Sequence, residues 1–283
     1  MVFYIIIPVH NESAHLKRCL QSFVNQSIKP DRLIIVNDSS TDNSQKIIDE
    51  FSEEYSWIEN IYFNSKKAHS PGSKVINAFY EGFNHLDNDF DFIGKFDADI
   101  ILPPHYFEKT LQLFASDNRI GIAGGNLYIK NNIEWEYENI SKKTKVRGPI
   151  KLYRKECFKD IGGLKKSIGW DTVDVLLAHF YGWKVKTDTS LHVKHLKPTG
   201  KAYGKKSKLK QGEAFYKMRY GFWLSFIAAS KLAFQKKSFS FLADCLTGYF
   251  KAKNQGLEYI VSEEEGKFIR ALRWRDIKKK LSY

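Results

Sequence analysis

The sequence predicts an α/β protein with a Rossmann-like, doubly wound and mostly parallel sheet, followed by a basic, aromatic and mainly helical appendage. Over the first 130 residues, short apolar segments rich in β-branched residues alternate with segments whose apolar residues recur at helical spacing. Strands separated by helices are joined by crossover connections and pair in parallel, which predicts the sheet. After Pro198 the sequence becomes lysine-rich and then aromatic, which predicts a separate region.

The first strand and the first helix are the best defined of these elements. Residues 3–9 (FYIIIPV) form an apolar run, as a strand buried on both faces requires. Asn11, Glu12 and Ser13 then offer helix-capping side chains, and apolar residues recur at helical spacing at positions 16, 20, 23 and 24. We therefore expect a helix directly after the first strand.

The same alternation continues to residue 130. We expect further strands at residues 33–36, 58–63, 90–96 and 120–129. Between them, residues 40–42 cap a helix around residues 47–51, residues 75–86 form the next helix, and Pro103-Pro104 starts another. From residue 131 to 196 the pattern is mixed, with helices near Lys155 and at 172–181 and strands near Ile150 and Val185. Residues 1–200 are expected to form one domain, with halves at 1–130 and 131–200.

Residues 201–283 are expected to form the basic, mainly helical region. A lysine-rich loop leads into residues 215–250, which are aromatic and broadly apolar with lysines interspersed. The uncharged stretches there are shorter than the ~20 residues that a membrane-spanning helix needs. Two interpretations remain open: a helical appendage packed on the first domain, or a helix that lies in a membrane interface.

Charge and cysteine content narrow the classes of partner. The net charge is +13, and the seven lysines between Asp188 and Glu213 have no carboxylate among them. Such a segment attracts polyanions, anionic lipid or phosphorylated substrates, or it is simply a solvated surface. Three distant cysteines, Cys19, Cys157 and Cys245, support neither a zinc site nor a disulfide framework, so a reducing compartment is expected. No basic segment precedes the first strand, so no signal peptide is expected.

Polar residues follow three of the expected strands at their carboxyl ends: residues 10–12, Asn37-Asp38 and Asp97-Ala98-Asp99. Ligands of doubly wound sheets bind outside the carboxyl ends of the strands, so we expect these residues to converge on one site. Two carboxylates one residue apart can hold a divalent cation such as magnesium or manganese and leave positions for substrate phosphates. Alternatively, residues 97–99 are only a polar junction between strand and loop.

The order of these motifs resembles that of family 2 glycosyltransferases, which have the GT-A fold. Residues 5–12, 34–42 (IIVNDSSTD) and 94–99 (GKFDAD) are similar to three successive motifs of that family. Gly72 and Asn77 match a fourth, looser motif on the donor side. Arg147-Gly148, Gly162-Gly163 and residues 169–174 (GWDTVD) resemble the acceptor-side half. The resemblance covers roughly the first 200 residues. Residues 1–130 would then be the nucleotide-sugar-binding half and residues 131–200 the acceptor-binding half.

The resemblance implies roles for the matching donor-side residues. Asp38 would hydrogen-bond the base rather than cap the following helix, and Asp97 would face the ribose and the donor sugar. Asp99 would bind manganese or magnesium, together with Asp97 and with His195 from late in the domain. Lys74 would close over the phosphates or belong to a solvated loop. The residues predicted to bind the nucleotide and donor sugar are Pro8, His10, Asn11, Glu12, Asp38, Gly72, Lys74, Asn77, Asp97 and Ala98.

On the acceptor side, the resemblance implies that Asp171 is the general base, which removes a proton from the acceptor hydroxyl. Asp171 is expected at the N-terminus of its helix, where it could instead be only an N-cap, and Asp174 competes for the same role. Trp170 could form a wall of the acceptor site, and Gly148 is placed on this side by its motif. His192 and His195 are three residues apart on a strand, so they face opposite ways and are not expected to share one metal ion.

The resemblance therefore implies an inverting hexosyltransferase that moves a sugar from a nucleoside-diphosphate sugar, with UDP-sugar favoured, to a hydroxyl of a glycan or lipid-linked glycan. The nearest match to the Gln-x-x-Arg-Trp motif of processive synthases, at residues 270–274 (RALRW), lacks the glutamine, so a non-processive enzyme is expected. The expected location is the cytoplasm, with peripheral contact to the anionic cytoplasmic face of a membrane.

Three alternatives stay open at this point. A nucleotidyltransferase should carry a glycine-rich basic loop after the first strand, where this chain has His10-Asn11-Glu12. A basic nucleic-acid-binding module would use the net charge of +13, although nucleic acid is not an expected partner. A non-catalytic nucleotide-sugar-binding module would keep the donor site without turnover. Three departures from the family pattern are Asn37, Ser39 and the GWDTVD sequence around Asp171.

Overall fold

The structure of the chain is a computed structural model, and it describes residues 1–64, 73–198 and 205–282. The chain divides into two compact units. The first comprises Met1–Leu164 and Tyr181–Thr199, and the second comprises Lys165–Phe180 and Gly200–Tyr283. Residues 165–180, which we assigned to the sheet domain, therefore group with the C-terminal helices.

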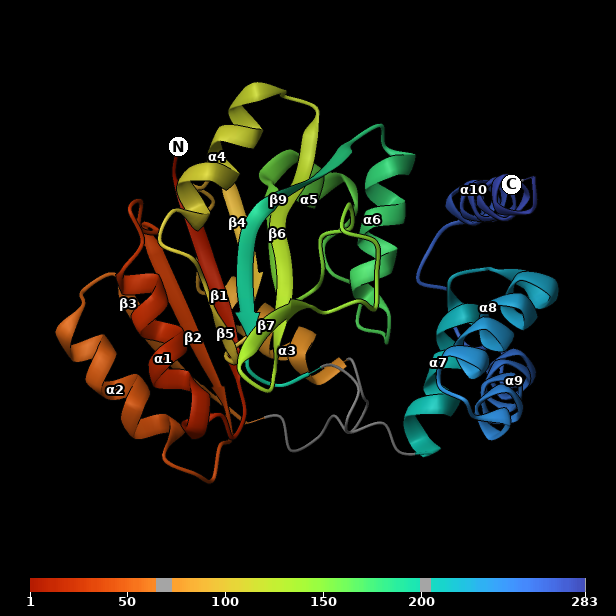
Figure 1. Ribbon diagram of the computed structural model, residues 1–283, viewed down its shortest axis with the longest axis horizontal. Coiled ribbons are helices and arrows are strands. Elements are labelled where there is room, and N and C mark those ends of the chain that lie inside the picture. Colours follow the sequence, from red (N-terminus) through yellow and green to blue (C-terminus); the bar gives the residue numbers. More distant parts are fainter. Residues whose placement is uncertain (65–72, 199–204, 283) are drawn as a thin grey trace. The chain divides into compact units, whose positions relative to one another are not determined.

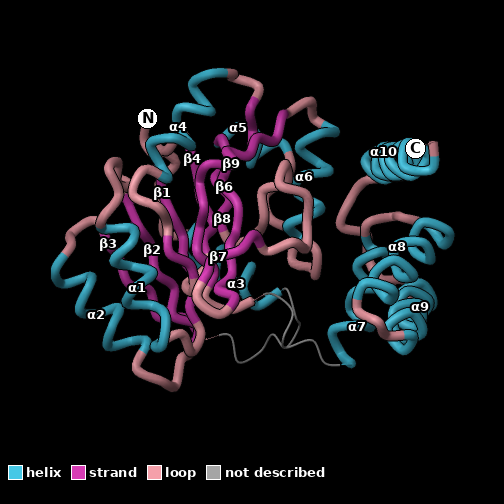
Figure 2. The backbone as a smooth tube through the Cα atoms, viewed as in Figure 1, coloured by secondary structure: helices cyan, strands magenta, loops and turns pink. Residues whose placement is uncertain are grey.

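One half of the sheet in the first unit is entirely parallel. Its strands are β1 (Phe3–Val9), β2 (Arg32–Asp38), β3 (Ile58–Phe63) and β4 (Phe92–Phe96), in the order β3-β2-β1-β4. The helices α1 (Ser13–Val24), α2 (Ser44–Glu54) and α3 (Ser73–Phe83) alternate with them along the chain, as predicted (Figures 1 and 2). Because β2 lies on one side of β1 and β4 on the other, the strand order reverses at β1. This switch point is where doubly wound sheets bind ligands.

The other half of the sheet is mixed. β8 (Ile150–Arg154) pairs antiparallel with both β4 and β6 (Ile120–Asn131), and β9 (Lys184–His195) runs parallel to β6. Strands β1 to β4, β6 and β9 therefore share one direction, so the sheet is mostly parallel. Two short strands were not predicted, β5 (Ile100–Ile101) and β7 (Glu134–Tyr137). The helices α4 (Tyr106–Ser116) and α5 (Lys155–Asp160) complete the unit, and α4 begins two residues after Pro104.

The apolar core explains why the central strands read as nearly continuous apolar runs. Ile5, Ile6 and Ile7 of β1 are all fully buried, because both faces of the sheet are covered. Phe23 of α1 packs edge-on against Phe96 of β4, at 5.7 Å between ring centroids. These contacts fix α1 and the end of β4 relative to each other, immediately below the residues that follow β4.

The second unit is helical. It contains α6 (Trp170–Phe180), α7 (Lys205–Lys217), α8 (Gly221–Gln235), α9 (Phe239–Asn254) and α10 (Glu263–Leu281). The lysine-rich segment predicted as a loop is thus largely helix α7. It packs closely on α9, since a Cβ added at Gly212 would lie 1.7 Å from the Cys245 carbonyl oxygen. Among the helices that the structure describes, none is long and apolar enough to cross a membrane.

Candidate functional site

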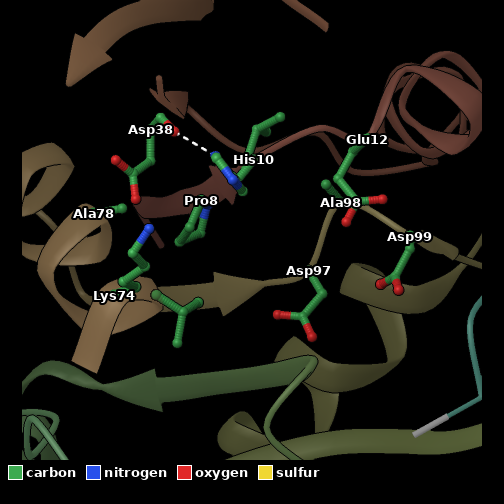
Figure 3. A pocket seen from close by; sticks show the side chains of 11 residues that line it. Pro8, His10, Glu12, Asp38, Lys74, Ala78, Asp97, Ala98 and Asp99 are labelled. Atoms are coloured by element: carbon green, nitrogen blue, oxygen red, sulfur yellow. Dashed lines mark hydrogen bonds between the residues drawn. The ribbon is translucent and has the colours of Figure 1, made fainter. Parts of the chain in front are cut away.

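A cavity of about 290 Å³ lies at the carboxyl ends of β1, β2 and β4, beside α3. Figure 3 shows Asp38, His10 and Lys74 on one side of it and Glu12, Asp97 and Asp99 on the other. Four carboxylates from three separate segments therefore face one space at the switch point of the sheet. The residues that line the cavity are Pro8, Val9, His10, Glu12, Asp38, Lys74, Val75, Ala78, Asp97, Ala98 and Asp99.

Two loops build the rim of this cavity and hold each other in place. Asn11 and Ser39 both have left-handed backbone, with φ of 57° and 52°, a conformation that glycine and asparagine adopt most readily. Asp42 accepts hydrogen bonds from the backbone nitrogens of Ser13 and Ser44, each at 3.0 Å, at the first residues of α1 and α2. One carboxylate thus caps both helices. The start of α1 is capped by Asp42 and not, as the sequence had suggested, by the side chains of residues 11–13.

Asn11 has a structural place in this arrangement and does not line the cavity. Its side-chain oxygen accepts the backbone N–H of Thr41 at 2.8 Å. His10 is held in a similar way, with Nδ1 2.6 Å from the carbonyl oxygen of Asp38. A proton on Nδ1 makes that contact a hydrogen bond and directs Nε2 away from the Asp38 carbonyl. The Asp38 side chain itself is buried at the cavity wall.

The carboxylate of Asp97 is held in place by a buried lysine, Lys95. Lys95 of β4 is only 2% exposed, and its Nζ forms an ion pair with Asp97 Oδ1. The backbone nitrogen of Asp97 donates to the carbonyl oxygen of Pro149 at 3.0 Å, which anchors the end of β4 to the turn before β8. A buried charge is costly unless it is paired, so Lys95 and Asp97 hold each other in position.

Asp99 faces a chain of buried polar residues. Its Oδ2 lies 3.7 Å from His195 Nε2, and His195 Nδ1 lies 2.9 Å from Glu138 Oε2. Arg147 donates to the same Glu138 oxygen. Burial, followed by the charge of Asp97, raises the pKa of Asp99 to about 6. Burial alone would lower the pKa of His195, but the hydrogen bond to Glu138 and the charge of Asp99 raise it above its ordinary value.

Asp99 and His195 offer part of a ligand set for a divalent cation. In the part of the chain that the structure describes, no three His, Cys, Asp or Glu side chains converge in metal-binding geometry. Asp99 and His195 nonetheless offer an oxygen and a nitrogen 3.7 Å apart, within the spacing of about 3–4 Å between two ligands of one ion bound at about 2.1 Å. Glu138 accepts from the far ring nitrogen, the arrangement typical of a metal-binding histidine. The donor set fits an ion that takes its remaining ligands from substrate phosphates and water.

Comparison with known proteins identifies the family. The glycosyl transferase family 2 model matches residues 4–166, more than half of the chain. The chain belongs to glycosyltransferase family 2. The predicted resemblance is thereby confirmed, and the matched residues include both loops of the cavity rim and the residues that follow β4.

Relatives agree with this family, and solved structures agree with the fold. A probable glycosyltransferase of Bacillus subtilis, YdaM, is 35% identical over 97 residues, which cover 34% of this chain and 22% of the relative. Chondroitin synthase of Escherichia coli is 32% identical over 149 residues, which cover 50% of this chain and 20% of that enzyme. The chain thus spans about a fifth of the length of either relative. Residues 1–349 of S. aureus TarS, solved in complex with UDP-GlcNAc, superpose with a TM-score of 0.56 at 16% identity, covering 95% of this chain and 78% of that one. That likeness supports the predicted GT-A fold.

Within this family 2 chain, the structure gathers most of the predicted donor-side residues. Seven of them line the cavity, namely Pro8, His10, Glu12, Asp38, Lys74, Asp97 and Ala98, and so does Asp99, which was predicted to bind the metal. Asn77 lies on α3 but does not line the cavity, and Gly72 lies outside the described residues. His192 is exposed and His195 is buried, so the two do face opposite ways as expected.

The predicted acceptor-side residues are divided between the two units. Gly148 lies in a buried turn before β8 of the first unit. Trp170, Asp171 and Asp174 belong to α6 of the second unit. Because α6 begins at Trp170, Asp171 lies in its first turn, at the N-terminus of the helix as expected, and not in the N-cap position of the alternative interpretation. Asp174 is almost fully buried.

Sequence reasoning missed several residues that shape the site. Lys95 could have been found, because a lysine inside the buried strand FIGKF needs a partner. Lys197, whose Nζ lies 2.5 Å from Glu12 Oε2, was noticed only as part of the basic segment. Glu138 and Val75 carry no recognisable pattern. Arg147 was noticed for its motif, but its contact with Glu138 could not be predicted.

Proposed function

We propose that this chain transfers a sugar from a nucleoside-diphosphate sugar, with UDP-sugar favoured, to a hydroxyl of a glycan or lipid-linked glycan. The observation that carries the proposal is the cavity at the switch point of the sheet, in which the carboxylates of Asp38, Asp97 and Asp99 gather beside His195. Membership of family 2 supports glycosyl transfer, and the UDP-GlcNAc complex of TarS supports the donor class for this fold.

The residues that line the cavity suggest which part of the donor each of them binds. Asp38, buried below the rim, is suited to accept hydrogen bonds from a base N–H. Lys74 at the start of α3 offers a cation to the diphosphate. Asp97, fixed by Lys95, offers a carboxylate to hydroxyls of the ribose or the sugar. The donor would thus lie across the ends of β1, β2 and β4.

We further propose that Asp99 and His195 hold a divalent cation, manganese or magnesium, with Asp97 close by. A bound cation would neutralise the charge that develops on the departing diphosphate. Asp99 would bind the cation as a carboxylate and His195 as a neutral imidazole, so cation binding would displace the protons that the raised pKa values of both groups favour. Glu138, itself held by Arg147, fixes the ring of His195.

For the acceptor, we propose Asp171 as the general base of an inverting, single-displacement reaction. It would remove the proton of the acceptor hydroxyl as that oxygen attacks the anomeric carbon and the bond to the diphosphate breaks. The resemblance of residues 169–174 (GWDTVD) to the family's acceptor-side motif supports this assignment; these residues follow the segment 4–166 that the family model matches. Without the glutamine of the processive motif, we propose that one sugar is added per encounter.

A panel of nucleotide sugars, with and without manganese, tests the proposal. We expect UDP-sugars to raise the thermal unfolding midpoint and to be slowly hydrolysed, with both effects stronger when manganese is present. Asp99→Asn should remove the manganese-dependent part and leave the midpoint of the free protein nearly unchanged. If no nucleotide sugar stabilises the protein, the proposed activity is wrong.

A further inference from the structure

The second unit contains a cavity of its own, about 210 Å³ in volume. It lies where the ends of α7 and α9 meet the start of α8 and the middle of α10. Three cations and three tyrosines surround it, and no acidic residue is among the described residues that line it. The lining residues are Tyr216, Arg219, Gly221, Tyr249, Lys253, Tyr259 and Arg270.

Arg219 has a left-handed backbone conformation, and two contacts hold its side chain at this cavity. It follows α7 with φ of 54°, a left-handed position at which glycine is preferred and other residues cost roughly 1 kcal/mol. Its guanidinium carbon lies 3.6 Å from the centre of the Tyr259 ring, and its Nε donates to the Val261 carbonyl at 3.1 Å. These contacts fix the plane of the guanidinium and leave its two terminal nitrogens without a protein acceptor among the described residues.

Arg270 and Lys253 add two further cations to the same wall. Arg270 Nη1 donates to the Arg219 carbonyl at 2.7 Å, so the two arginines are positioned together. Within residues 1–64, 73–198 and 205–282, no carboxylate forms an ion pair with Arg219, Arg270 or Lys253. The nearby Glu263 forms an ion pair with Lys267 at 3.1 Å. That hydrogen bond is the main reason why the pKa of Glu263 is lowered, and the charges of Arg219 and Arg270 lower it further without an ion pair to either arginine. The cavity therefore offers unpaired donors to an anion.

An exposed aromatic cluster lies directly beside this cationic cavity. Phe222 packs against Trp223, Phe226 and Phe250, with ring centroids 5.2 to 6.2 Å apart. Trp223 is 68% exposed, and Phe226 and Phe250 are about two-fifths exposed. Phe222 follows Gly221 of the cavity, and Phe250 follows Tyr249. Large aromatic side chains next to cations are typical of surfaces that enter the headgroup region of a bilayer.

We propose that this cavity binds the phosphate of an anionic lipid headgroup, while the aromatic cluster of Phe222, Trp223, Phe226 and Phe250 enters the membrane interface. Two fixed guanidinium groups and the flexible Lys253 suit a phosphodiester, and the tyrosine hydroxyls suit the rest of a polar headgroup. The proposal concerns the second unit only and does not depend on the donor site proposed above.

Vesicle co-sedimentation of the full chain, without donor or acceptor, tests the proposal. Vesicles of phosphatidylcholine are compared with vesicles of equal parts phosphatidylcholine and phosphatidylglycerol. Lys253→Gln is matched by Lys251→Gln, which removes the same charge from an exposed position on α9 outside the cavity. Loss of one surface lysine should weaken binding to anionic vesicles roughly fivefold. We expect Lys253→Gln to weaken it at least twentyfold, because the bound phosphate also loses a direct contact.

Arg270→Lys gives a second test that leaves the net charge unchanged. We expect it to weaken binding to the anionic vesicles at least fivefold, with an unchanged thermal midpoint as the check on folding. Equal losses in Lys253→Gln and Lys251→Gln, or no loss in Arg270→Lys, would show that only general charge attraction acts. Binding of a soluble phosphodiester polymer that needs Lys253, with no binding to vesicles, would also overturn the lipid assignment.

Discussion

Lys95 shows how a single buried charge can fix the position of a carboxylate in the proposed donor site. The lysine is 2% exposed and forms an ion pair with Asp97, whose side chain is 31% exposed and lines the cavity. Hydrogen bonds between charged groups contribute about 1.5–3 kcal/mol, and here the contact also restricts where the carboxylate can lie. The main task of Lys95 is therefore to position Asp97.

We predict that Lys95→Met weakens binding of the UDP-sugar about tenfold, because Asp97 then loses its fixed orientation. Calorimetric titration of the donor measures the effect, and KM should rise more than kcat falls. The free protein must keep its circular dichroism spectrum for the comparison to hold. Unchanged donor affinity in a folded Lys95→Met protein would contradict the positioning role.

Glu138 supports His195 without touching the cavity. Residues that orient a metal-binding histidine typically contribute 10–100-fold to metal affinity. We predict that Glu138→Gln weakens manganese binding in the presence of UDP by a factor in that range, as measured by the electron paramagnetic resonance of free manganese. Glu136→Gln is the matched control, since Glu136 lies two residues earlier, on β7, and hydrogen-bonds the exposed Asn131. Equal affinities in the two variants would exclude the supporting role.

The residues of this site differ in how far the sequence could predict them. Pro8, Glu12, Asp38, Asp97 and Asp99 directly end or follow strands, so the topology alone brings them to one edge of the sheet. Glu138 is different, because it meets His195 only through the pairing of β6 with β9 and the turn after β7. Contacts that depend on such long-range register leave no local pattern in the sequence.

At the scale of elements, the loop after β2 connects two helices through Asp42. Partial burial would raise the pKa of this carboxyl, but hydrogen bonds from Ser44 and Ser13 lower it below its ordinary value of 3.8. Its contribution to stability is therefore fully present above pH 3.8 and is lost as the pH falls toward the folded-state pKa. The ends of α1 and α2 should loosen together in acid.

We predict that Asp42→Ala lowers the free energy of unfolding by about 2 kcal/mol near pH 7, since a helix cap contributes typically about 1 kcal/mol and Asp42 provides two. Urea denaturation at pH 7 and at pH 3 measures the difference, which should shrink at the lower pH. Asn43→Ala is the control, because Asn43 precedes α2 but makes no side-chain cap hydrogen bond. A loss in Asn43→Ala as large as that in Asp42→Ala would contradict the assignment.

The elements themselves were largely predictable where they are buried. β1, β2 and β4 are apolar because the sheet is covered on both faces there. The edge strand β3 (IENIYF) is partly exposed, yet it was predicted with its observed bounds, Ile58–Phe63. The missed strands are different in kind. β5 has two residues, and β7 (EWEY) is half-exposed with charged alternate residues. α7 was predicted as a loop because its many lysines obscure the apolar spacing of a helix. The helix is instead defined by its close packing on α9 at Gly212.

At the scale of the whole molecule, the proposed chemistry is divided between the two units. The cavity proposed for the donor is built wholly from the first unit, whereas Asp171 and Asp174 belong to α6 of the second. If the donor is bound by the first unit alone, removal of the base should leave donor binding intact. Binding and turnover should therefore separate in variants of α6.

We predict that Asp171→Asn lowers turnover by roughly 10²–10⁴-fold, the range expected for loss of a general base, with the affinity for the UDP-sugar unchanged. Initial rates with a saturating acceptor and calorimetry with the donor measure the two quantities on the same protein. Asp174→Asn provides the comparison, since this buried side chain lies one helical turn further along α6. Collapse of turnover in a folded Asp174→Asn protein, with Asp171→Asn active, would transfer the role of base to Asp174. A parallel loss of donor affinity in Asp171→Asn would instead show that the second unit takes part in binding the nucleotide sugar.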